Sequence, residues 1–147
     1  MMNKIAIELV DGADDSFIPK YATSGSSGAD LRYHGEVKTL QPGERYLAKT
    51  GIKIQIPLGL EGQVRSRSGL AIKYGIAVLN SPGTIDSDYR GEIGVILINH
   101  SSEYFVISSG DRIAQIVFSL VSNKEFVKAE ELETTIREGG GFGHTGI

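Results

Sequence analysis

The chain has 147 residues and a net charge of −3. This length predicts one domain that buries roughly two-thirds of its unfolded surface without disulfides or structural metals. The acidic balance argues against a nucleic-acid backbone or an anionic membrane surface as partner, and no run is long and apolar enough to cross a bilayer. With no cysteine and no signal-peptide pattern, the sequence indicates a cytoplasmic protein.

Nineteen glycines and four prolines indicate many tight turns, as in an all-β domain. Short apolar runs recur between turn residues in a spacing typical of a sandwich, jelly roll or barrel. We therefore expect strands at residues 4–10, 29–33, 37–40, 46–56, 60–65, 76–79, 93–99, 104–107, 113–120 and 125–127. One short helix is expected over Ser68–Tyr74, with Ser68 as its N-cap and Gly75 at its end.

The segment at residues 80–92, NSPGTIDSDYRGE, carries an unusual density of charged and aromatic groups for a connection. Pro82 fixes φ and Gly83 tolerates a positive φ, so the pair fits the centre of a type II turn. This turn would join the strand at 76–79 to an extended run that begins at Thr84.

An extended run through this segment would place Asp86, Asp88 and Arg90 on one face and Tyr89 on the other. The same charges fit a solvated hairpin that keeps an edge strand soluble. The residues alone favour neither interpretation. A calcium loop of the EF-hand type does not fit, because Arg90 and Leu97 stand where an acid and a bidentate Glu are required.

At the carboxyl end we predict a flexible arm over residues 134–147, following a single β domain over residues 1–133. Four glycines within five residues bury too little apolar area to offset their ordering entropy. The GFGHTG in this arm matches a dinucleotide fingerprint by chance, since no βαβ unit precedes it and no helix follows it. Arg137, Phe142 and Thr145 favour an arm that a ligand orders over a disposable linker.

The local groups in the chain indicate a site that binds an anion. They do not indicate a covalent or a zinc-dependent mechanism. Arg67, Ser68 and the free N–H groups at the start of the expected helix would converge on a bound anion. The sequence offers no cysteine and no Ser-His pair as a nucleophile. His34, His100 and His144 lack the spacing of zinc ligands.

Five segments, taken in chain order, contain the candidate functional residues. They contain Asp30 after the flexible SGSSG loop; Arg67, Ser68 and Gly69 in RSRSGLA; Asn80, Gly83, Asp86 and Tyr89 in the hairpin; Asp111, Arg112 and Gln115 in GDRIAQIVF; and Arg137, Phe142, Gly143 and Thr145 in the tail. In this order, and over nearly the whole chain, they resemble the five motifs of the trimeric dUTP nucleotidohydrolases, the dUTPases.

The resemblance implies an all-β, jelly-roll-like fold with one short helix and a flexible glycine-rich C-terminal arm. It implies a homotrimer with shared active sites, in which water attacks the α-phosphorus of dUTP to release dUMP and pyrophosphate. Mg²⁺ is the implied cofactor. Such an activity limits uracil incorporation into DNA and supplies dUMP for dTMP synthesis.

The family arrangement also implies a role for each matching residue. Asp86 would be the base for the attacking water, and Asp30 would help to hold the hydrated magnesium ion. Asn80 and the backbone around Gly83 would hold uracil, and Tyr89 would lie under the deoxyribose, where it excludes a 2′-hydroxyl.

The resemblance also implies that the remaining motif residues bind the phosphates. The expected phosphate contacts come from Arg67, Ser68, Gly69 and Gln115, with Asp111 orienting a neighbouring arginine and Arg112 in support. The arm would add substrate contacts from Arg137, Phe142, Gly143 and Thr145.

Two positions depart from the family pattern. Ser66 stands where proline often precedes the Arg-Ser pair, which predicts a less rigid strand end, and Arg65 adds a charge beside it. His144 replaces the usual serine of the tail and removes a hydroxyl contact to the terminal phosphate. The rival interpretations are a dCTP deaminase and a nucleotide-controlled regulatory protein; Asp86 and Tyr89 favour the dUTPase.

Overall fold

The computed structural model describes residues 4–141 of the chain. Within this range the chain forms eleven β-strands, a single-turn 3₁₀ helix at Asp15–Phe17 and one α-helix, α1, at Ser68–Tyr74. The strands are β1 (Ala6–Leu9), β2 (Ala29–Arg32), β3 (Lys38–Leu40), β4 (Arg45–Lys49), β5 (Ile52–Gln55), β6 (Leu60–Arg65), β7 (Ile76–Val78), β8 (Gly83–Ile85), β9 (Gly94–Asn99), β10 (Phe105–Ile107) and β11 (Arg112–Leu120).

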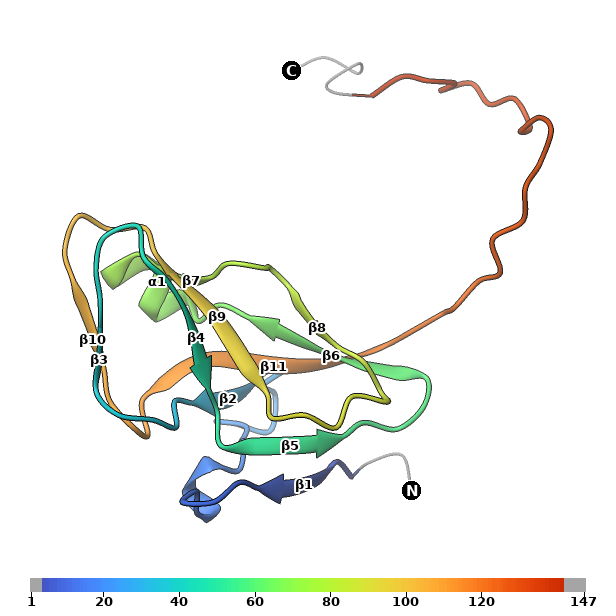
Figure 1. Cartoon of the computed structure of the whole chain (residues 1–147). Coiled ribbons are helices and arrows are strands. Elements are labelled where there is room, and N and C mark those ends of the chain that lie inside the picture. The colour runs from blue at the N-terminus through green and yellow to red at the C-terminus, as the bar shows by residue number, and fades with distance from the viewer. Residues whose placement is uncertain (1–3, 142–147) are drawn as a thin grey trace.

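Over these residues, four antiparallel sheets enclose one apolar core (Figure 1). The largest sheet has the order β2-β11-β6-β8, and a three-stranded sheet, β4-β9-β7, lies across it. The pairs β1-β5 and β10-β3 complete the enclosure. Alternate residues of the strands, such as Leu31, Val64 and Leu97, are buried between the sheets, as the two-residue period of a strand requires.

The apolar run at residues 46–56 forms two strands rather than the single strand predicted. Thr50 and Gly51 separate β4 from β5, and Gly51 has a φ of 74°, a conformation that favours glycine. A Cβ at Gly51 would lie 3.0 Å from His34 Cβ and 3.1 Å from Ala13 Cβ. The prediction failed here because a lone glycine inside an apolar run is also compatible with a continuous strand.

Helix α1 has the predicted bounds but not the predicted N-cap. It ends at Gly75, which has a φ of 65° and whose N–H donates to Ala71 O, 3.0 Å away. The residue in the N-cap position is Arg67, which makes no side-chain capping hydrogen bond. Ser68 is therefore the first helical residue, and the prediction of Ser68 as N-cap was wrong.

The hairpin at residues 80–92 also differs from its predicted geometry. The Ser81–Pro82 peptide bond is cis, and Gly83 has no positive φ but begins β8, so the turn is not type II. The extended run stops at Ile85, and the N–H of Tyr89 donates to Asp86 O at 3.2 Å. Asp86 and the residues that follow it thus form a turn, and the predicted alternation of their side chains along a strand was wrong.

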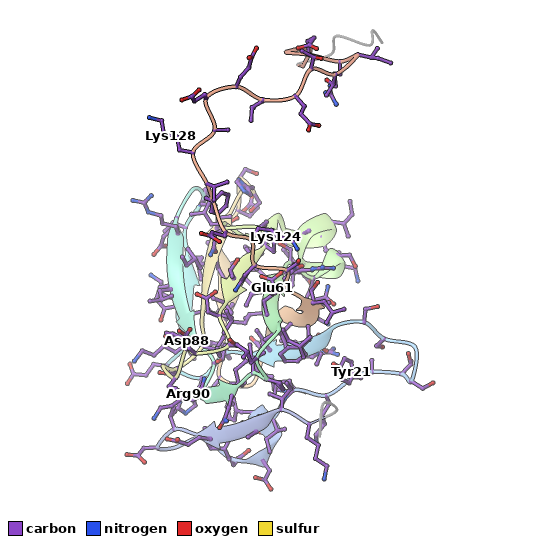
Figure 2. The ribbon with its side chains drawn as sticks, turned by 90° about the vertical axis from the view of Figure 1, so that its right-hand side faces the viewer. Tyr21, Glu61, Asp88, Arg90, Lys124 and Lys128 are labelled. Atoms are coloured by element: carbon purple, nitrogen blue, oxygen red, sulfur yellow. The ribbon has the colours of Figure 1, made fainter. Side chains whose placement is uncertain are left out.

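Beyond β11 the chain leaves the strands and runs outward (Figure 1). The N–H of Val121 still donates to Gly59 O at 2.9 Å, but residues 122–141 contain no strand. The strand predicted at 125–127 was therefore wrong, because in this chain no neighbouring strand edge pairs with it. Lys128 already lies clear of the sheets (Figure 2). The domain limit at residue 133 stays a prediction.

We expect Gly51→Ala to destabilise the fold more than Gly43→Ala does. Both glycines have φ near 75°, with values of 74° and 75°, but a Cβ at Gly43 would meet no atom within 4 Å. Gly43→Ala therefore reports only the conformational cost, about 1 kcal/mol. Gly51→Ala adds close contacts and should cost at least about 1 kcal/mol more. Urea unfolding of both variants measures the difference, and equal losses would contradict it.

Candidate active site

A cavity of about 260 Å³ lies between the hairpin and the strands β4 and β9. Its wall contains all four hairpin residues predicted to bind or act on substrate: Asn80, Gly83, Asp86 and Tyr89. The remaining lining comes from Leu47, Val64, Val78, Thr84, Ile85, Glu92, Gly94, Val95 and Ile96. The four residues predicted on this hairpin thus line one cavity together with apolar side chains, and their roles stay predictions.

Gly83 brings main chain to the wall of this cavity. A Cβ at Gly83 would lie 3.2 Å from Asn80 Nδ2 and 3.3 Å from Val64 Cβ, tighter than ordinary contacts. The glycine therefore lets the Asn80 amide approach the first backbone groups of β8. An amide side chain beside exposed main-chain groups can present both donors and acceptors to a flat polar ring.

Asp86 lies where the cavity meets a second, open groove of about 670 Å³. The groove is also lined by Glu61 and Asp88. The Asp86 side chain is exposed, and no ion pair engages it within residues 4–141. A carboxylate in this state is free to accept a proton from water.

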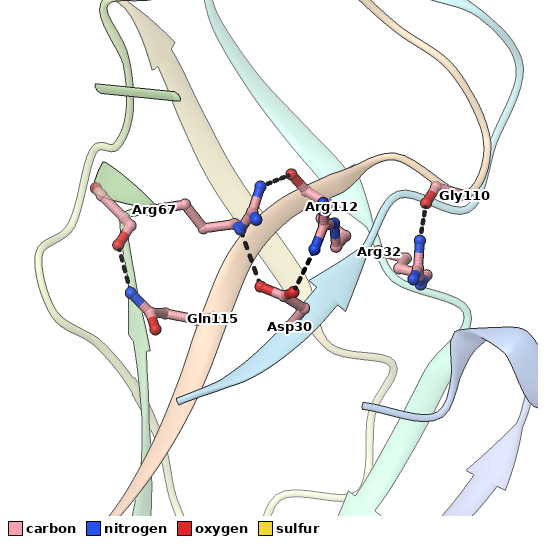
Figure 3. A network of polar contacts seen from close by, with 7 residues as sticks. Asp30, Arg32, Arg67, Gly110, Arg112 and Gln115 are labelled. Carbon is pink, nitrogen blue, oxygen red and sulfur yellow. Dashed lines mark hydrogen bonds and ion pairs between the residues drawn. The ribbon is translucent and has the colours of Figure 1, made fainter. Parts of the chain in front are cut away.

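A second group of functional residues forms an arginine cluster, which we define as Asp30, Arg67 and Arg112 (Figure 3). Asp30 Oδ1 accepts from Arg67 Nε at 2.9 Å, and Asp30 Oδ2 pairs with Arg112 Nη1 at 3.3 Å. Arg67 Nη1 also donates to the main-chain O of Arg112 at 3.1 Å. One carboxylate therefore orients two guanidinium groups, which leaves further N–H donors for an anion.

Gln115 lies beside the arginine cluster (Figure 3). Its Nε2 donates to Ser66 O at 2.9 Å. A Cβ at Gly28 would lie only 2.1 Å from Gln115 Oε1, so the glycine of the flexible loop makes room for this amide. Ser68 and Gly69, at the start of α1, are exposed and complete the predicted phosphate-binding set.

Other predicted site residues lie elsewhere. Asp111 Oδ2 accepts from Ser108 N at 2.8 Å, within the turn before β11, so its predicted role in orienting an arginine stays a prediction. Arg137 Nε donates to Gly140 O at 2.7 Å on the outward segment. The predicted contacts from Phe142, Gly143 and Thr145, and the effect of His144, concern residues outside the described range.

The cavity and the arginine cluster are on different sides of the four-stranded sheet. Val64 and Gly83 face the cavity, whereas Asp30, on the far edge strand β2, and Gln115, on the neighbouring strand β11, belong to the opposite face by strand alternation. Three strand spacings separate β2 from β8, roughly 14 Å. One chain therefore does not bring the two groups together.

Ser66 links the end of β6 to β7 and to Gln115, and sequence reasoning missed this contact. Its Oγ accepts the main-chain N–H of Val78 at 2.8 Å, and its O accepts from Gln115. The residue expected to loosen the end of β6 thus ties that end to β7. Arg65, the other unusual residue, donates its Nε to Gln63 Oε1 at 3.2 Å and does not join the cluster.

The sequence matches a known protein family over most of its length. The model of the dUTPase family matches residues 14–146. The chain belongs to the dUTPase family. It is 55% identical over 134 residues to the deoxyuridine 5′-triphosphate nucleotidohydrolase of Hydrogenobaculum sp., covering 91% of this chain and 93% of that protein. It is 56% identical over 133 residues to the corresponding Chlamydia muridarum protein, covering 89% and 92%.

Solved structures of this family have the same fold. The chain superposes on a mutant dUTPase of phage 80alpha with a TM-score of 0.83 and 26% identity, covering 98% of this chain and 99% of that one. For the dUTPase of Streptococcus mutans the TM-score is 0.75 at 28% identity, covering 82% and 98%. The predicted family and the predicted jelly-roll-like β fold are confirmed. Over residues 4–141, no helix is long and apolar enough to span a membrane.

We expect Ser66→Ala to destabilise the chain by about 1–3 kcal/mol, because the N–H of Val78 loses its acceptor in a part-buried position. Ser66→Thr keeps the hydroxyl and should lose much less. Unfolding in urea compares the two variants, and a stability of Ser66→Ala equal to that of the wild type would show that the Ser66–Val78 contact is dispensable.

Proposed function

We propose that this member of the dUTPase family hydrolyses dUTP to dUMP and pyrophosphate in composite sites of a homotrimer. In each site the hairpin cavity of one chain faces the arginine cluster of another. The observation that carries the proposal is the separation of the two groups on opposite faces of one sheet. A nucleoside triphosphate has a base, a sugar and phosphates to bind. The cavity suits the base and the sugar, and the arginine cluster suits the phosphates.

The cavity takes the nucleoside. Asn80 and the main chain at Gly83 hydrogen-bond the edge of uracil, and the apolar wall packs on its ring. The ring of Tyr89 lies against the deoxyribose and leaves no room for a 2′-hydroxyl. A crowded sugar site rejects the ribonucleotide because the extra oxygen would displace the ring or lose its own hydration.

Asp86 acts as the general base. Its exposed carboxylate stands at the mouth of the cavity, next to the place where the α-phosphate of a bound nucleotide emerges. It takes a proton from the water that attacks the α-phosphorus, and pyrophosphate leaves on the opposite side. The chain forms no covalent intermediate in this mechanism.

The arginine cluster of a second chain takes the phosphates. Arg67 and Arg112, held by Asp30, offer charge-assisted donors, and Gln115, Ser68 and Gly69 add neutral contacts. These donors are positioned before the substrate arrives, so they stabilise charge that develops on the departing pyrophosphate with little reorganisation.

Members of this family generally depend on Mg²⁺. Within residues 4–141 no group of three or more acidic or histidine side chains forms a metal cage. This suits magnesium, which keeps much of its water and binds substrate phosphates more than protein. Both Asp30 oxygens are engaged by arginines, so Asp30 would hold the ion through water. When bound, the ion offsets the triphosphate charge.

The outward segment supports association between chains. Phe126 and Ile136 are fully exposed, and Val127 and Leu132 are nearly so, although all four are apolar. Their burial against another chain would be favourable. Residues 121–136 can span up to about 50 Å, enough to carry Arg137 to a neighbouring site. Ordering of the arm over bound substrate would exclude water from the reaction. The predicted cytoplasmic location remains part of this proposal.

We expect Asp86→Asn to bind dUTP and to lower kcat by at least about 10²-fold, the lower range for a positioned base. Asp88→Asn is the matched control, because Asp88 is an exposed acid two residues away that lines the groove and not the cavity. It should retain most of the wild-type rate. Steady-state release of pyrophosphate measures both, and near-normal turnover of Asp86→Asn would reject Asp86 as the base.

We expect mixed trimers of two inactive variants to recover activity. Asp86→Asn keeps the arm, and a chain that ends before Arg137 keeps the base, so each alone should turn over dUTP very slowly. After the two are refolded together, some sites combine an intact Asp86 with an intact arm from another chain. Mixed trimers that form but stay as slow as the parents would show that each arm serves its own chain.

A further inference from the structure

The Tyr89 ring is held by Gly91 and Glu92, two and three residues further along the chain. Tyr89 Oη donates to the main-chain O of Glu92 at 3.1 Å. A Cβ at Gly91 would lie 2.3 Å from Tyr89 Oη and 2.6 Å from its Cζ, so the ring rests directly on the Gly91 backbone. Tyr89 is 44% exposed and is not part of the buried core. Its position in the cavity therefore depends on where Gly91 and Glu92 are fixed.

The Glu92 side chain reaches from the hairpin to the corner between β4 and β5. Glu92 Oε1 accepts from the N–H of Gly51 at 2.9 Å, and Oε2 lies 3.6 Å from Lys49 Nζ. The side chain is only 20% exposed. One oxygen of this carboxylate thus accepts from a neutral main-chain donor, and the other forms a weak, exposed ion pair.

The corner that Glu92 reaches is rigid. Both the N–H and the hydroxyl of Thr50 donate to Ile93 O, at 3.1 and 2.7 Å, and the N–H of Ile93 donates to Ile52 O at 2.9 Å. Thr50 and Ile93 are fully buried. These bonds tie the Ile93 side of the Glu92–Ile93 peptide group to the core, and the Glu92 carboxylate adds a second tie on the hairpin side. The turn that contains Asp86 and Tyr89 is exposed.

We propose that Glu92 is a positioning residue for the selection of deoxyribose over ribose. Its carboxylate, bound to Gly51 N–H, fixes the main-chain carbonyl that holds Tyr89 Oη, and so fixes the Tyr89 ring against the sugar. The inference rests on the proposed role of Tyr89 at the deoxyribose and goes beyond it, because Glu92 itself has no assigned part in substrate recognition.

The physical reason is the small size of the group to be rejected. A ring that pivots by about 1 Å admits an extra hydroxyl, so discrimination requires a ring held more tightly than an exposed turn alone provides. Two hydrogen bonds, from Tyr89 Oη to the Glu92 carbonyl and from Gly51 N–H to the Glu92 carboxylate, connect the exposed ring to the buried corner. Loss of either bond should loosen the ring without removing it.

The experiment compares kcat/KM for dUTP and UTP in the full-length enzyme with magnesium. Glu92→Ala removes the contact to Gly51, and Glu92→Asp keeps the charge but is too short by one methylene to make it. In each, the dUTP/UTP ratio should fall about fivefold to tenfold, the factor that corresponds to one hydrogen bond. The dUTP/dTTP ratio, which reports the uracil end of the cavity, should stay within about twofold of wild type.

Two controls separate the hydrogen bond from the charge. Glu92→Gln keeps an acceptor oxygen for Gly51 N–H, and Lys49→Gln removes only the weak ion pair, so both should keep the wild-type dUTP/UTP ratio. Tyr89→Phe keeps the ring and removes the donor to Glu92. Tyr89→Phe should lower the dUTP/UTP ratio as Glu92→Ala does. The double variant with both changes should lower it no further, because the two changes break the same series of contacts.

The outcomes distinguish this inference from the proposal beneath it. If Tyr89→Ala leaves the dUTP/UTP ratio unchanged, Tyr89 does not select the sugar and its proposed role fails. If Tyr89→Ala abolishes the selection while Glu92→Ala and Glu92→Asp keep it, the role of Tyr89 stands and the positioning role of Glu92 is wrong. A fall in the dUTP/dTTP ratio as large as that in the dUTP/UTP ratio would also overturn it, since general loosening of the cavity affects both ends.

Discussion

The alternation of side chains along β6 determines where each functional group of this protein lies. Val64 points between the sheets and forms part of the cavity wall, and its neighbour Arg65 points to the opposite face. Pairing with β8 on one side and β11 on the other extends this division to the hairpin and to Gln115. A one-residue shift of β6 would exchange the two faces and bury Arg65. The strand therefore sets the core and underlies the proposed division of the site between chains.

The fold was largely predictable because its local signals agree with its tertiary structure. The alternating runs, the Ser68–Tyr74 helix and its glycine terminator all have physical causes that act over a few residues. The predictions failed where distant contacts decide. Gly51 takes a positive φ with the side chains of His34 and Ala13 packed close to it, and within residues 4–141 no strand edge pairs with residues 125–127.

The residues of the candidate site were proposed from their resemblance to the family motifs, whereas the contacts between them could not be predicted. The segment with Asp86 and Tyr89 resembles a dUTPase motif, yet no local rule says that Tyr89 rests on Gly91 or that Asp30 orients both Arg67 and Arg112. Ser66 is the clearest case. The absence of proline at this position predicted a less rigid end of β6. The Ser66 hydroxyl instead accepts the N–H of Val78, which lies in β7, the strand that follows α1. Hydrogen bonds between separate elements are visible only in three dimensions.

The exposed apolar segment after β11 has a consequence for how the enzyme responds to dilution. In the proposed trimer, association would bury Phe126 and Ile136, which are exposed in the single chain, so assembly and stability would depend together on protein concentration. In the proposed composite site the same association also completes the catalytic machinery. The rate per chain then falls on dilution, because separated chains keep their cavities and their arginines but no longer hold them around one substrate.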